Sequence, residues 1–481
     1  MTKMFSSNLL RRICCRSLPS LLGTIVVLWF CSSQVLVAMA AAGTKVGYLP
    51  RVIQEQPLPF ELETGYIGVG ESEDIQLFYY FVKSESNPSD DPIVVWVSGG
   101  PGCSSFFAMT QEIGPLIMDL PKNVSVLPTF SLNPYSWTKV ASFVYLDLPV
   151  GTGFSYAKSA KNYTSDTLEA SNHGAEFIRK WLIDYPEYQS NSFYVGGDSY
   201  SGTLIPMFAQ AISNGNDAML KPAINFKGYL LGNGVTHFSE HDYTYQFALG
   251  YGLISEEFAE KSYDDCIRNP DKKPFFTKCQ LDMVQFLMLT FVNNAAYILD
   301  TSCLAKNGAE DVISGKAFVP TKRFNGVNAN IFNRYLLCRS DLIAAQYVNV
   351  ESVQEALHVK KGSIDHWEQC RGDLPYNNNV RDSMQYHANL STKGYRSLIY
   401  NGDRDLFIPS LSAEAWTKSL NYSIIDDWRP WFVNNQIVGY TRTFSNNMTY
   451  AKIKGSGHLA PSVTPLQCFA MFKRWISYEK L

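Results

Sequence analysis

The segment from Asn191 to Pro206 constrains the fold of this chain more than any other stretch. It begins with a short apolar run, Phe193–Val195, which is typical of a buried strand, and two glycines follow almost at once. Ser199 comes next, and the residues from Ser201 onward can form a helix. A strand, a sharp turn and a helix with one serine at the apex leave the serine oxygen clear of the sheet.

The match to this pattern is incomplete. Such turns usually have glycine two residues after the serine, because the turn has no room for larger side chains. This chain has Ser201 at that position, and Gly202 follows. Taken alone, the segment fits either a nucleophile at Ser199 or an ordinary strand–turn–helix corner.

Two later segments repeat the arrangement of an apolar strand followed by a polar residue. Residues Ser397–Asp405 end in acidic side chains, and residues Tyr450–His458 end in a histidine beside glycine. Open α/β sheets keep their sites at the carboxyl ends of strands. The order Ser, Asp, His along the chain is that of an α/β-hydrolase triad. The sequence therefore predicts an α/β class protein with an α/β-hydrolase fold.

The first 40 residues have the composition of a targeting segment. Four basic residues and no acidic ones are followed by the apolar run Leu21–Phe30, and Ala38-Met39-Ala40 fits a cleavage site. We favour a cleaved signal peptide over 1–40, since polar residues at 32–34 interrupt the apolar run. An uncleaved anchor is the alternative.

Charge excludes one class of partner. The formal net charge of -3 becomes more negative once the basic first 40 residues are removed, and no dense Lys/Arg run exists elsewhere. This argues against a nucleic-acid binder. A hydrophobic content of 46% over 481 residues is typical of a globular chain with a large core.

Cysteines and sequons indicate the secretory pathway. Seven of ten cysteines remain after the signal peptide, without a CxxC pair, which disfavours a zinc site and allows three bridges with one thiol left over. The glycan acceptor pattern occurs at Asn123, Asn162, Asn389, Asn421 and Asn447. Together with the signal peptide, these features predict a secretory glycoprotein.

The remaining pattern divides the chain into a core and an insertion. We expect strands over 75–82, 93–97, 141–146 and 225–231, helices over 165–185, 201–213, 411–420 and 465–478, and irregular chain over 43–64. The predicted domains are core residues 41–235, a mainly helical cap over 236–340, and core residues 341–481. Within the cap, residues 306–323 are the expected exposed loop and cutting site.

A glycine-rich turn follows the apolar run of residues 93–97. Residues Ser98–Cys103 read Ser-Gly-Gly-Pro-Gly-Cys, and such a turn exposes N–H groups that can bind an oxyanion. An ordinary tight turn is the alternative interpretation.

Several motifs together resemble the serine carboxypeptidases. They are Gly99–Ser104, Glu112–Pro115, Asp147–Tyr156, Gly197–Gly202 and Gly457-His458, and the similarity extends from about Pro57 to the C-terminus. The resemblance implies an α/β-hydrolase fold, a secretory or vacuolar glycoprotein, and no metal or organic cofactor.

The resemblance also implies roles for individual residues. Ser199 would be the nucleophile, His458 the general base and Asp405 the acid, with Asp403 as the structural alternative to Asp405. The implied oxyanion hole is made by the N–H groups of Gly100 and Tyr200. The implied disulfides are Cys103–Cys370, Cys266–Cys279 and Cys303–Cys338, which leaves Cys468 as a free buried thiol.

The substrate-binding positions depart from the peptidase pattern. The implied substrate-binding residues are Ser98, Gly99, Glu112 and Asp198, and peptidases of the family usually carry Asn and Glu in place of Ser98 and Asp198. Ser98, Asp198 and the stretches Leu420–Trp431 and Gly439–Arg442 are instead similar to plant serine carboxypeptidase-like acyltransferases. However, Leu459-Ala-Pro-Ser-Val463 replaces the usual Thr-Ala-Pro-Glu-Tyr after the histidine.

Three functions remain open. The first is an acyltransferase that moves an acyl group, often phenolic, from a glucose ester to an acceptor. The second is a serine carboxypeptidase acting on a peptide C-terminus, and the third is an inactive secreted glycoprotein. All three exclude nucleic acid and a stable membrane anchor as partners, and a homodimer is left open.

Overall fold

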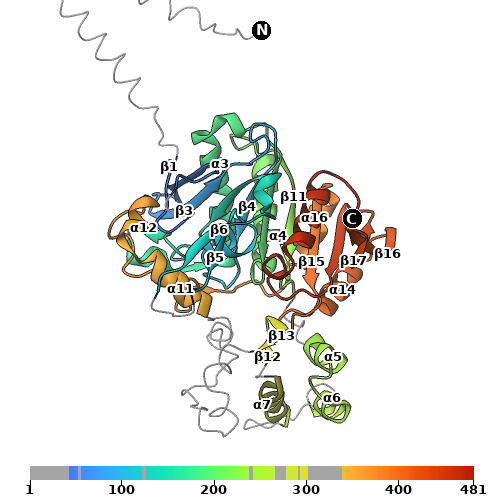
Figure 1. Ribbon diagram of the computed structural model, residues 1–481. Coiled ribbons are helices and arrows are strands. Elements are labelled where there is room, and N and C mark those ends of the chain that lie inside the picture. Colours follow the sequence, from blue (N-terminus) through green and yellow to red (C-terminus); the bar gives the residue numbers. More distant parts are fainter. Residues whose placement is uncertain are drawn as a thin grey trace, which may run out of the picture. The chain divides into compact units, whose positions relative to one another are not determined.

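A twelve-stranded sheet organises the part of the chain that the computed structural model describes, namely residues 43–52, 56–121, 126–237, 242–265, 278–290, 293–301 and 339–481 (Figure 1). Its order is β1 (Thr44–Val46), β2 (Leu62–Val69), β3 (Ile75–Val82), β7 (Ser142–Leu146), β4 (Ile93–Val97), β10 (Phe193–Asp198), β11 (Phe226–Gly232), β15 (Arg396–Gly402), β18 (Met448–Ile453), β17 (Gln436–Phe444) and β16 (Ile424–Val433). The short strand β8 (Tyr156–Ala157) pairs with β3 outside this order.

The centre of the sheet is parallel and its two margins are antiparallel. Neighbouring strands from β7 through β4, β10, β11 and β15 to β18 all pair in parallel. All five residues of β4 are buried, as expected for a parallel strand covered on both faces. The carboxyl ends of these six strands therefore meet at one edge of the sheet.

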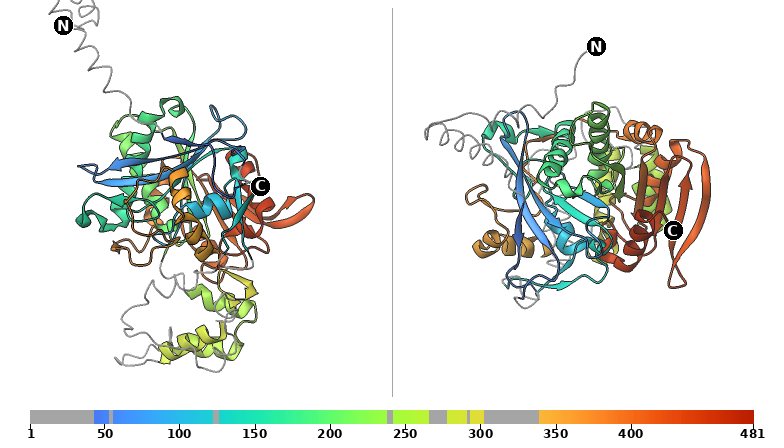
Figure 2. Two further views of the ribbon diagram at one scale, coloured as in Figure 1. Left: turned by 60° about the vertical axis from the view of Figure 1, so that its left-hand side comes forward. Right: turned by 90° about the horizontal axis from the view of Figure 1, so that it is seen from above.

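Helices cover both faces of the sheet (Figures 1 and 2). Helices α3 (Thr167–Asp184), α4 (Ser201–Asp217), α13 (Met384–Thr392) and α14 (Ser410–Ser419) contribute to one hydrophobic core. Helices α11 (Arg339–Val348), α12 (Glu351–Ala356) and α16 (Pro465–Ile476) contribute to the other. Strand β3 supplies both cores by alternation, with Leu77 and Tyr79 in one core and Phe78 and Tyr80 in the other.

Smaller elements complete the described chain. They are the π-helix η2 (Ala108–Glu112), the 3₁₀ helices η3 (Trp137–Lys139), η4 (Ala160–Tyr163) and η5 (Pro186–Tyr188), the strand pairs β5 (Leu116–Asp119) with β6 (Thr129–Leu132) and β9 (Ser165–Asp166) with β14 (Tyr376–Asn377), and α15 (Ala460–Val463). The described part of the predicted cap holds α5 (Asp242–Gly250), α6 (Glu256–Tyr263), α7 (Lys278–Thr290) and the pair β12 (Asn293–Asn294) with β13 (Tyr297–Thr301).

The strands and helices expected from the sequence are present, with two corrections. Residues 43–64 are not wholly irregular, because β1 lies there and pairs with the start of β2. The strand before His458 ends at Ile453, so the histidine stands on the following turn rather than at the strand end.

Other predictions about the chain are not decided by this structure. Residues Gly43–Leu481 form one compact unit, and the boundaries at residues 40, 235 and 340 stay predictions. The predicted signal peptide over 1–40 and the predicted exposed loop over 306–323 lie outside the described residues. In the ranges that are described, no helix is both long and apolar enough to span a membrane.

Candidate active site

The carboxyl edge of the parallel strands gathers polar residues from six different parts of the chain. In strand order they are Asp147 after β7, Ser98 after β4, Ser199 after β10, Asn233 after β11, Asp405 after β15 and His458 after β18. All six side chains belong to residues that are at least nine-tenths buried. This edge is therefore the candidate active site, as expected for an open α/β sheet.

Ser199 stands at the apex of a strained turn between β10 and α4. Its φ of 56° lies in the left-handed region, which non-glycine residues rarely adopt. The turn is fixed by the bond from the Ser199 N–H to the Gly232 carbonyl (3.0 Å) and by the bond from the Val235 N–H to the Ser199 carbonyl (2.9 Å). Strain held in this way by its surroundings is typical of a nucleophile elbow.

The position of glycine in this turn now has a physical reason. A Cβ added at Gly202 would lie 2.5 Å from the Val235 backbone nitrogen and 2.6 Å from Gly234. Ser201, in contrast, fits as the first residue of α4. The close approach therefore falls one residue later than in the usual pattern.

His458 is paired with Asp405. The His458 Nδ1 and Asp405 Oδ2 atoms are 2.7 Å apart, and both residues are almost fully buried. Asp403, the alternative acid, instead accepts the Gly455 N–H at 2.7 Å. Burial acts to lower the pKa of His458, but the charge and hydrogen bond of Asp405 and the charge of Asp198 raise it above its usual value.

The bond that would complete the triad is not made here. Within the described residues, the buried Nε2 atom of His458 has no hydrogen-bond partner. Hydrogen bonds of this kind are often long without substrate and shorten in the reacting complex. The structure thus brings His458 and Asp405 together and leaves the Nε2 atom of His458 free to accept a proton, as far as the described residues are concerned.

Asn233 is a site residue that the sequence analysis missed. Its side-chain Nδ2 donates to Asp405 Oδ2 at 2.7 Å, and its Oδ1 accepts the Gly402 N–H at 3.1 Å. Its position directly after an apolar strand was the available signal. The second oxygen of Asp405 accepts the Phe407 N–H at 2.8 Å, so this carboxylate is held from three sides.

The loop between β12 and β13 covers the histidine. The Ala296 carbonyl accepts the His458 N–H at 2.6 Å, and the Ala295 carbonyl accepts the Leu406 N–H at 2.9 Å. Part of the segment predicted as a cap therefore contacts the backbone that carries the acid and the histidine.

The glycine-rich turn lies directly against the serine turn. A Cβ added at Gly99 would lie 2.6 Å from the Ser199 Cβ and 3.0 Å from the Tyr200 backbone nitrogen. Only glycine permits this approach. Gly100 has a φ of 112°, and Cys103 in the same turn forms the predicted disulfide with Cys370. The turn carrying Gly100 and the Tyr200 backbone are thus adjacent, which an oxyanion hole requires.

Asp147 binds the chain that follows the glycine-rich turn, and the sequence analysis did not identify it as a site residue either. Its Oδ1 accepts the Ser104 hydroxyl (2.7 Å) and the Ser105 N–H (2.9 Å), and its Oδ2 accepts the Phe154 N–H (3.1 Å). Burial raises the pKa of Asp147 to about 7 despite these bonds. The Ser105 hydroxyl in turn accepts the Ser98 N–H at 3.1 Å, which extends the network to the site.

Three of the predicted substrate-binding residues carry buried oxygens without a hydrogen-bond partner among the described residues. Among the described residues, neither oxygen of Glu112, nor Oδ1 of Asp198, nor the Ser98 hydroxyl has a hydrogen-bond partner. Burial and the charge of Asp198 raise the pKa of Glu112 well above its usual value. Burial raises the pKa of Asp198 to about 6, although His458 and the Gly99 N–H act against it.

The remaining predicted positions have mixed outcomes. Cys468 is a free, buried thiol among the described cysteines, as predicted, and burial raises its pKa to about 12. Cys266, Cys303, Cys338 and Asn123 lie outside the described residues. Asn389, Asn421 and Asn447 are exposed, whereas Asn162 is half-buried and donates to Asp74 (3.0 Å); glycan attachment stays a prediction.

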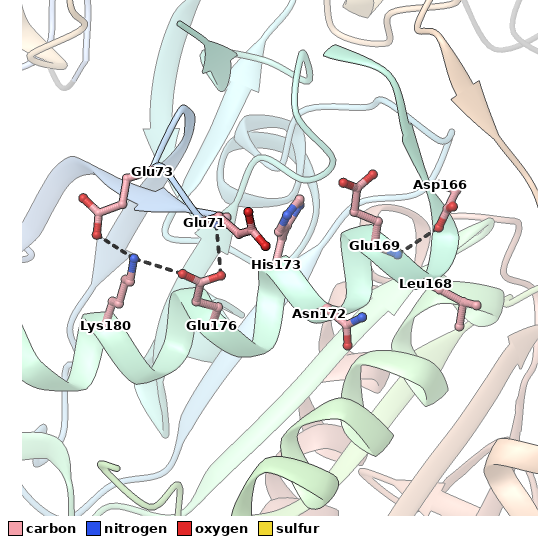
Figure 3. Close-up of a pocket in the computed structure, with 10 residues that line it drawn as sticks. Glu71, Glu73, Asp166, Leu168, Glu169, Asn172, His173, Glu176 and Lys180 are labelled. Carbon is pink, nitrogen blue, oxygen red and sulfur yellow. Dashed lines mark hydrogen bonds and ion pairs between the residues drawn. The ribbon is translucent and has the colours of Figure 1, made fainter. Parts of the chain in front are cut away.

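A second acidic region lies on α3 and the turn between β2 and β3 (Figure 3). This acidic groove contains Glu71, Glu73, Asp166, Glu169, His173, Glu176 and Lys180 among its lining residues. Lys180 contacts Glu73 at 2.7 Å and Glu176 at 2.9 Å, and Asp166 caps α3 by accepting the Glu169 N–H. Several of its charges thus have a structural role, and none of the predicted site residues lines it.

Comparison with known proteins identifies the family. The sequence model of the serine carboxypeptidases matches residues 50–478. The chain belongs to the serine carboxypeptidase family. Serine carboxypeptidase-like 12 of Arabidopsis thaliana is 46% identical over 445 residues, covering 92% of this chain and 95% of that protein. Serine carboxypeptidase-like 11 of the same plant is 44% identical over 442 residues, with the same coverage.

A solved structure supports the fold of this serine carboxypeptidase family member. The prohormone-processing carboxypeptidase Kex1Δp of Saccharomyces cerevisiae matches with a TM-score of 0.69 and 20% identity, covering 90% of this chain and 95% of that one. The predicted α/β-hydrolase fold is confirmed. Family membership supports serine-based hydrolase catalysis.

Proposed function

We propose that this protein is an acyltransferase that moves an acyl group from a 1-O-glucose ester to an acceptor through an acyl-enzyme on Ser199. The observation that carries the proposal is the set of buried, unpartnered oxygens on Ser98, Glu112 and Asp198. Asp198 directly precedes the proposed nucleophile and its charge acts on Glu112, while Ser98 precedes Gly99, which packs against Ser199.

This set of oxygens favours a neutral polyol over a free carboxylate. A carboxylate only accepts hydrogen bonds, so a site for it needs several converging donors, which include Glu112 and Asp198 only when they are protonated. Ser98 offers one rotatable O–H donor where the usual asparagine offers an oriented N–H, and Asp198 is shorter than the usual glutamate. Among the described residues, the charge that acts on the pKa of Glu112 is the like charge of Asp198, which raises it. A sugar hydroxyl both donates and accepts, so it can pair with a carboxylate or with the Ser98 hydroxyl.

The first half of the proposed reaction forms the acyl-enzyme. Ser199 Oγ attacks the ester carbonyl while Nε2 of His458 takes its proton, and Asp405 stabilises the resulting imidazolium. The N–H groups of Gly100 and Tyr200 stabilise the tetrahedral oxyanion. The intermediate then breaks its bond to the glucose oxygen, which leaves with the proton from His458.

The second half decides between transfer and hydrolysis. An acceptor hydroxyl or amine gives its proton to His458 and attacks the acyl-enzyme, which releases the acylated acceptor and restores Ser199. Water in the same position gives hydrolysis instead. Transfer therefore requires a bound acceptor that excludes water.

Product analysis tests the proposal directly. Purified glycosylated protein is incubated with a panel of 1-O-acyl-glucoses and acceptors, and in parallel with blocked dipeptides, with Ser199→Ala as the control. We expect acyl transfer from at least one glucose ester and weak or absent release of C-terminal residues. Neither reaction should occur with the control protein.

Two outcomes would replace the proposal. Efficient cleavage of blocked dipeptides with no turnover of any acyl-glucose would support a serine carboxypeptidase. No reaction with either panel and no labelling of Ser199 by a fluorophosphonate would support an inactive secreted glycoprotein. The proposed setting is the secretory pathway, either vacuolar or extracellular.

A further inference from the structure

We propose that Asn233 is a positioning residue of the triad, which holds the charged Asp405 in the orientation that His458 needs. The inference rests on the proposed catalytic roles of Ser199, Asp405 and His458. It does not depend on whether the acyl group is transferred to an acceptor or to water.

The contacts of Asn233 reach the acid directly. Its Nδ2 donates to Asp405 Oδ2 at 2.7 Å, and the same oxygen lies 2.7 Å from Nδ1 of His458. Hydrogen bonds to a charged acceptor are among the stronger ones in proteins. Asn233 therefore contacts the oxygen that pairs with the histidine, rather than a distant part of the carboxylate.

The backbone around Asn233 is fixed at the same time. Asn233 has a φ of 42°, where asparagine is tolerated better than most residues, and its own N–H donates to the Tyr400 carbonyl at 2.8 Å. Its Oδ1 accepts the Gly402 N–H at the end of β15. The residue is fully buried, so water does not compete with these bonds.

One short segment thereby connects the nucleophile turn to the acid. Gly232 accepts the Ser199 N–H, and Val235 donates to the Ser199 carbonyl, while Asn233 between them donates to Asp405. The three residues that must react together come from the turns after β10, β15 and β18. The segment 232–235 fixes two of them relative to each other.

The charge on Asp405 is the property that Asn233 controls. Its N–H partly neutralises the carboxylate, so removing this donor leaves a stronger negative field at His458. That field favours the imidazolium, so the pKa of His458 rises. The charged groups that act on the imidazole are Asp405 and Asp198, and both remain in the variants below.

The test follows the rate at which a fluorophosphonate labels Ser199 as a function of pH. This reaction needs neutral His458 to accept the serine proton, so the rate falls as pH drops through the pKa of His458. In Asn233→Gly, which keeps the positive φ, we expect that fall to move to higher pH by roughly one unit. The maximal rate should drop about tenfold because Asp405 is held less firmly.

A matched control and a second variant separate positioning from folding. Asn401→Gly removes the same atoms from another fully buried asparagine, whose side chain has no hydrogen-bond partner among the described residues, and should leave the pH of the fall unchanged. Asn233→Ala also removes the donor to Asp405 and the acceptor for Gly402 but keeps a Cβ atom. It should move the fall in labelling rate to higher pH by about as much as Asn233→Gly.

The outcomes distinguish this inference from the proposed function. Suppose that wild-type protein labels at Ser199 and that both Asn233 variants keep the wild-type pH profile, or show only a lower maximal labelling rate. Asn233 then has a structural role and the inference is wrong. If wild-type protein does not label at Ser199, the proposed catalytic role fails first. Acyl transfer without a shift in either variant would uphold the function and refute the positioning role.

Discussion

Two groups of carboxylates in this protein lie in opposite environments. In the acidic groove, Glu73 is largely exposed and bonded to Lys180, which holds its pKa below the usual value. At the candidate active site, Glu112 and Asp198 are buried with raised pKa values, and three of their four carboxylate oxygens have no hydrogen-bond partner in the part of the chain that the structure describes.

The difference shows which acidic cluster to associate with function. A paired, exposed carboxylate does not need a ligand to be tolerated in the folded protein. Such ion pairs contribute little to the free energy of unfolding. A buried and unpaired carboxyl group destabilises the fold, so its presence needs another explanation. Perturbed pKa values of this kind concentrate at functional sites. The predictions below test whether activity and pH-dependent stability follow the buried, unpaired group rather than the exposed, paired one.

The largest expected effect is on activity at the carboxyl edge. Ser199→Ala should lower kcat by roughly 10⁴ to 10⁶-fold, because the nucleophile is removed while the rest of the site stays. Its thermal unfolding should match wild type within a few degrees. Adduct mapping with a fluorophosphonate checks the assignment, and equal labelling of Ser199→Ala would show that the reactive serine lies elsewhere.

A second, smaller effect concerns the choice between peptide and acyl-glucose substrates, which we assign to Ser98 and Asp198. Ser98→Asn with Asp198→Glu restores the side chains usual in the peptidases and adds an oriented N–H donor. We expect peptidase activity relative to transfer to rise by roughly ten- to a hundredfold. The ratio of the two products measures it, and an unchanged ratio would separate these residues from specificity.

The third prediction concerns how stability depends on pH. The pKa of Glu112 is higher in the folded protein than its unfolded value of about 4.3. Between these values the folded state binds more protons, so stability falls as pH rises through that window. Glu112→Gln should not lose stability in this window, because glutamine does not titrate. The variant should therefore be more stable than wild type by about 1–3 kcal/mol at pH 8 but not at pH 4.

Denaturant unfolding at both pH values provides the measurement. A wild-type stability that rises between pH 5 and pH 8 in parallel with the variant would contradict the assignment of a raised pKa. The same variant should also lose activity, because the proposed sugar contact is altered.

The smallest effect is expected in the acidic groove. Glu73→Gln breaks an exposed ion pair with Lys180 and should cost less than about 1 kcal/mol, with a smaller effect at high salt. Activity should be unchanged. A large loss of activity in this variant would overturn the contrast between the two groups of carboxylates.

The sequence by itself determined the central strands of the sheet, four of the helices beside them and the chain order of the candidate triad. Apolar runs such as Ile93–Val97 could be identified locally because a strand buried on both faces has no polar positions to alternate. The glycine and serine residues around Ser199 likewise predicted a sharp turn, since glycine and other small residues are the ones that tight turns accommodate. The family motifs then supplied the roles.

Only the tertiary structure decided which side chains meet. Asp403 and Asp405 are two residues apart and chemically identical, and the turn after β15 places one beside Gly455 and the other beside His458. Asn233 contacts Asp405, 172 residues away in the sequence, and Asp147 contacts Ser104, 43 residues away. The local pattern of apolar and polar residues indicates roughly where a strand ends. Hydrogen bonds between side chains depend on distances of a few ångströms, and these are set only after distant strands have paired.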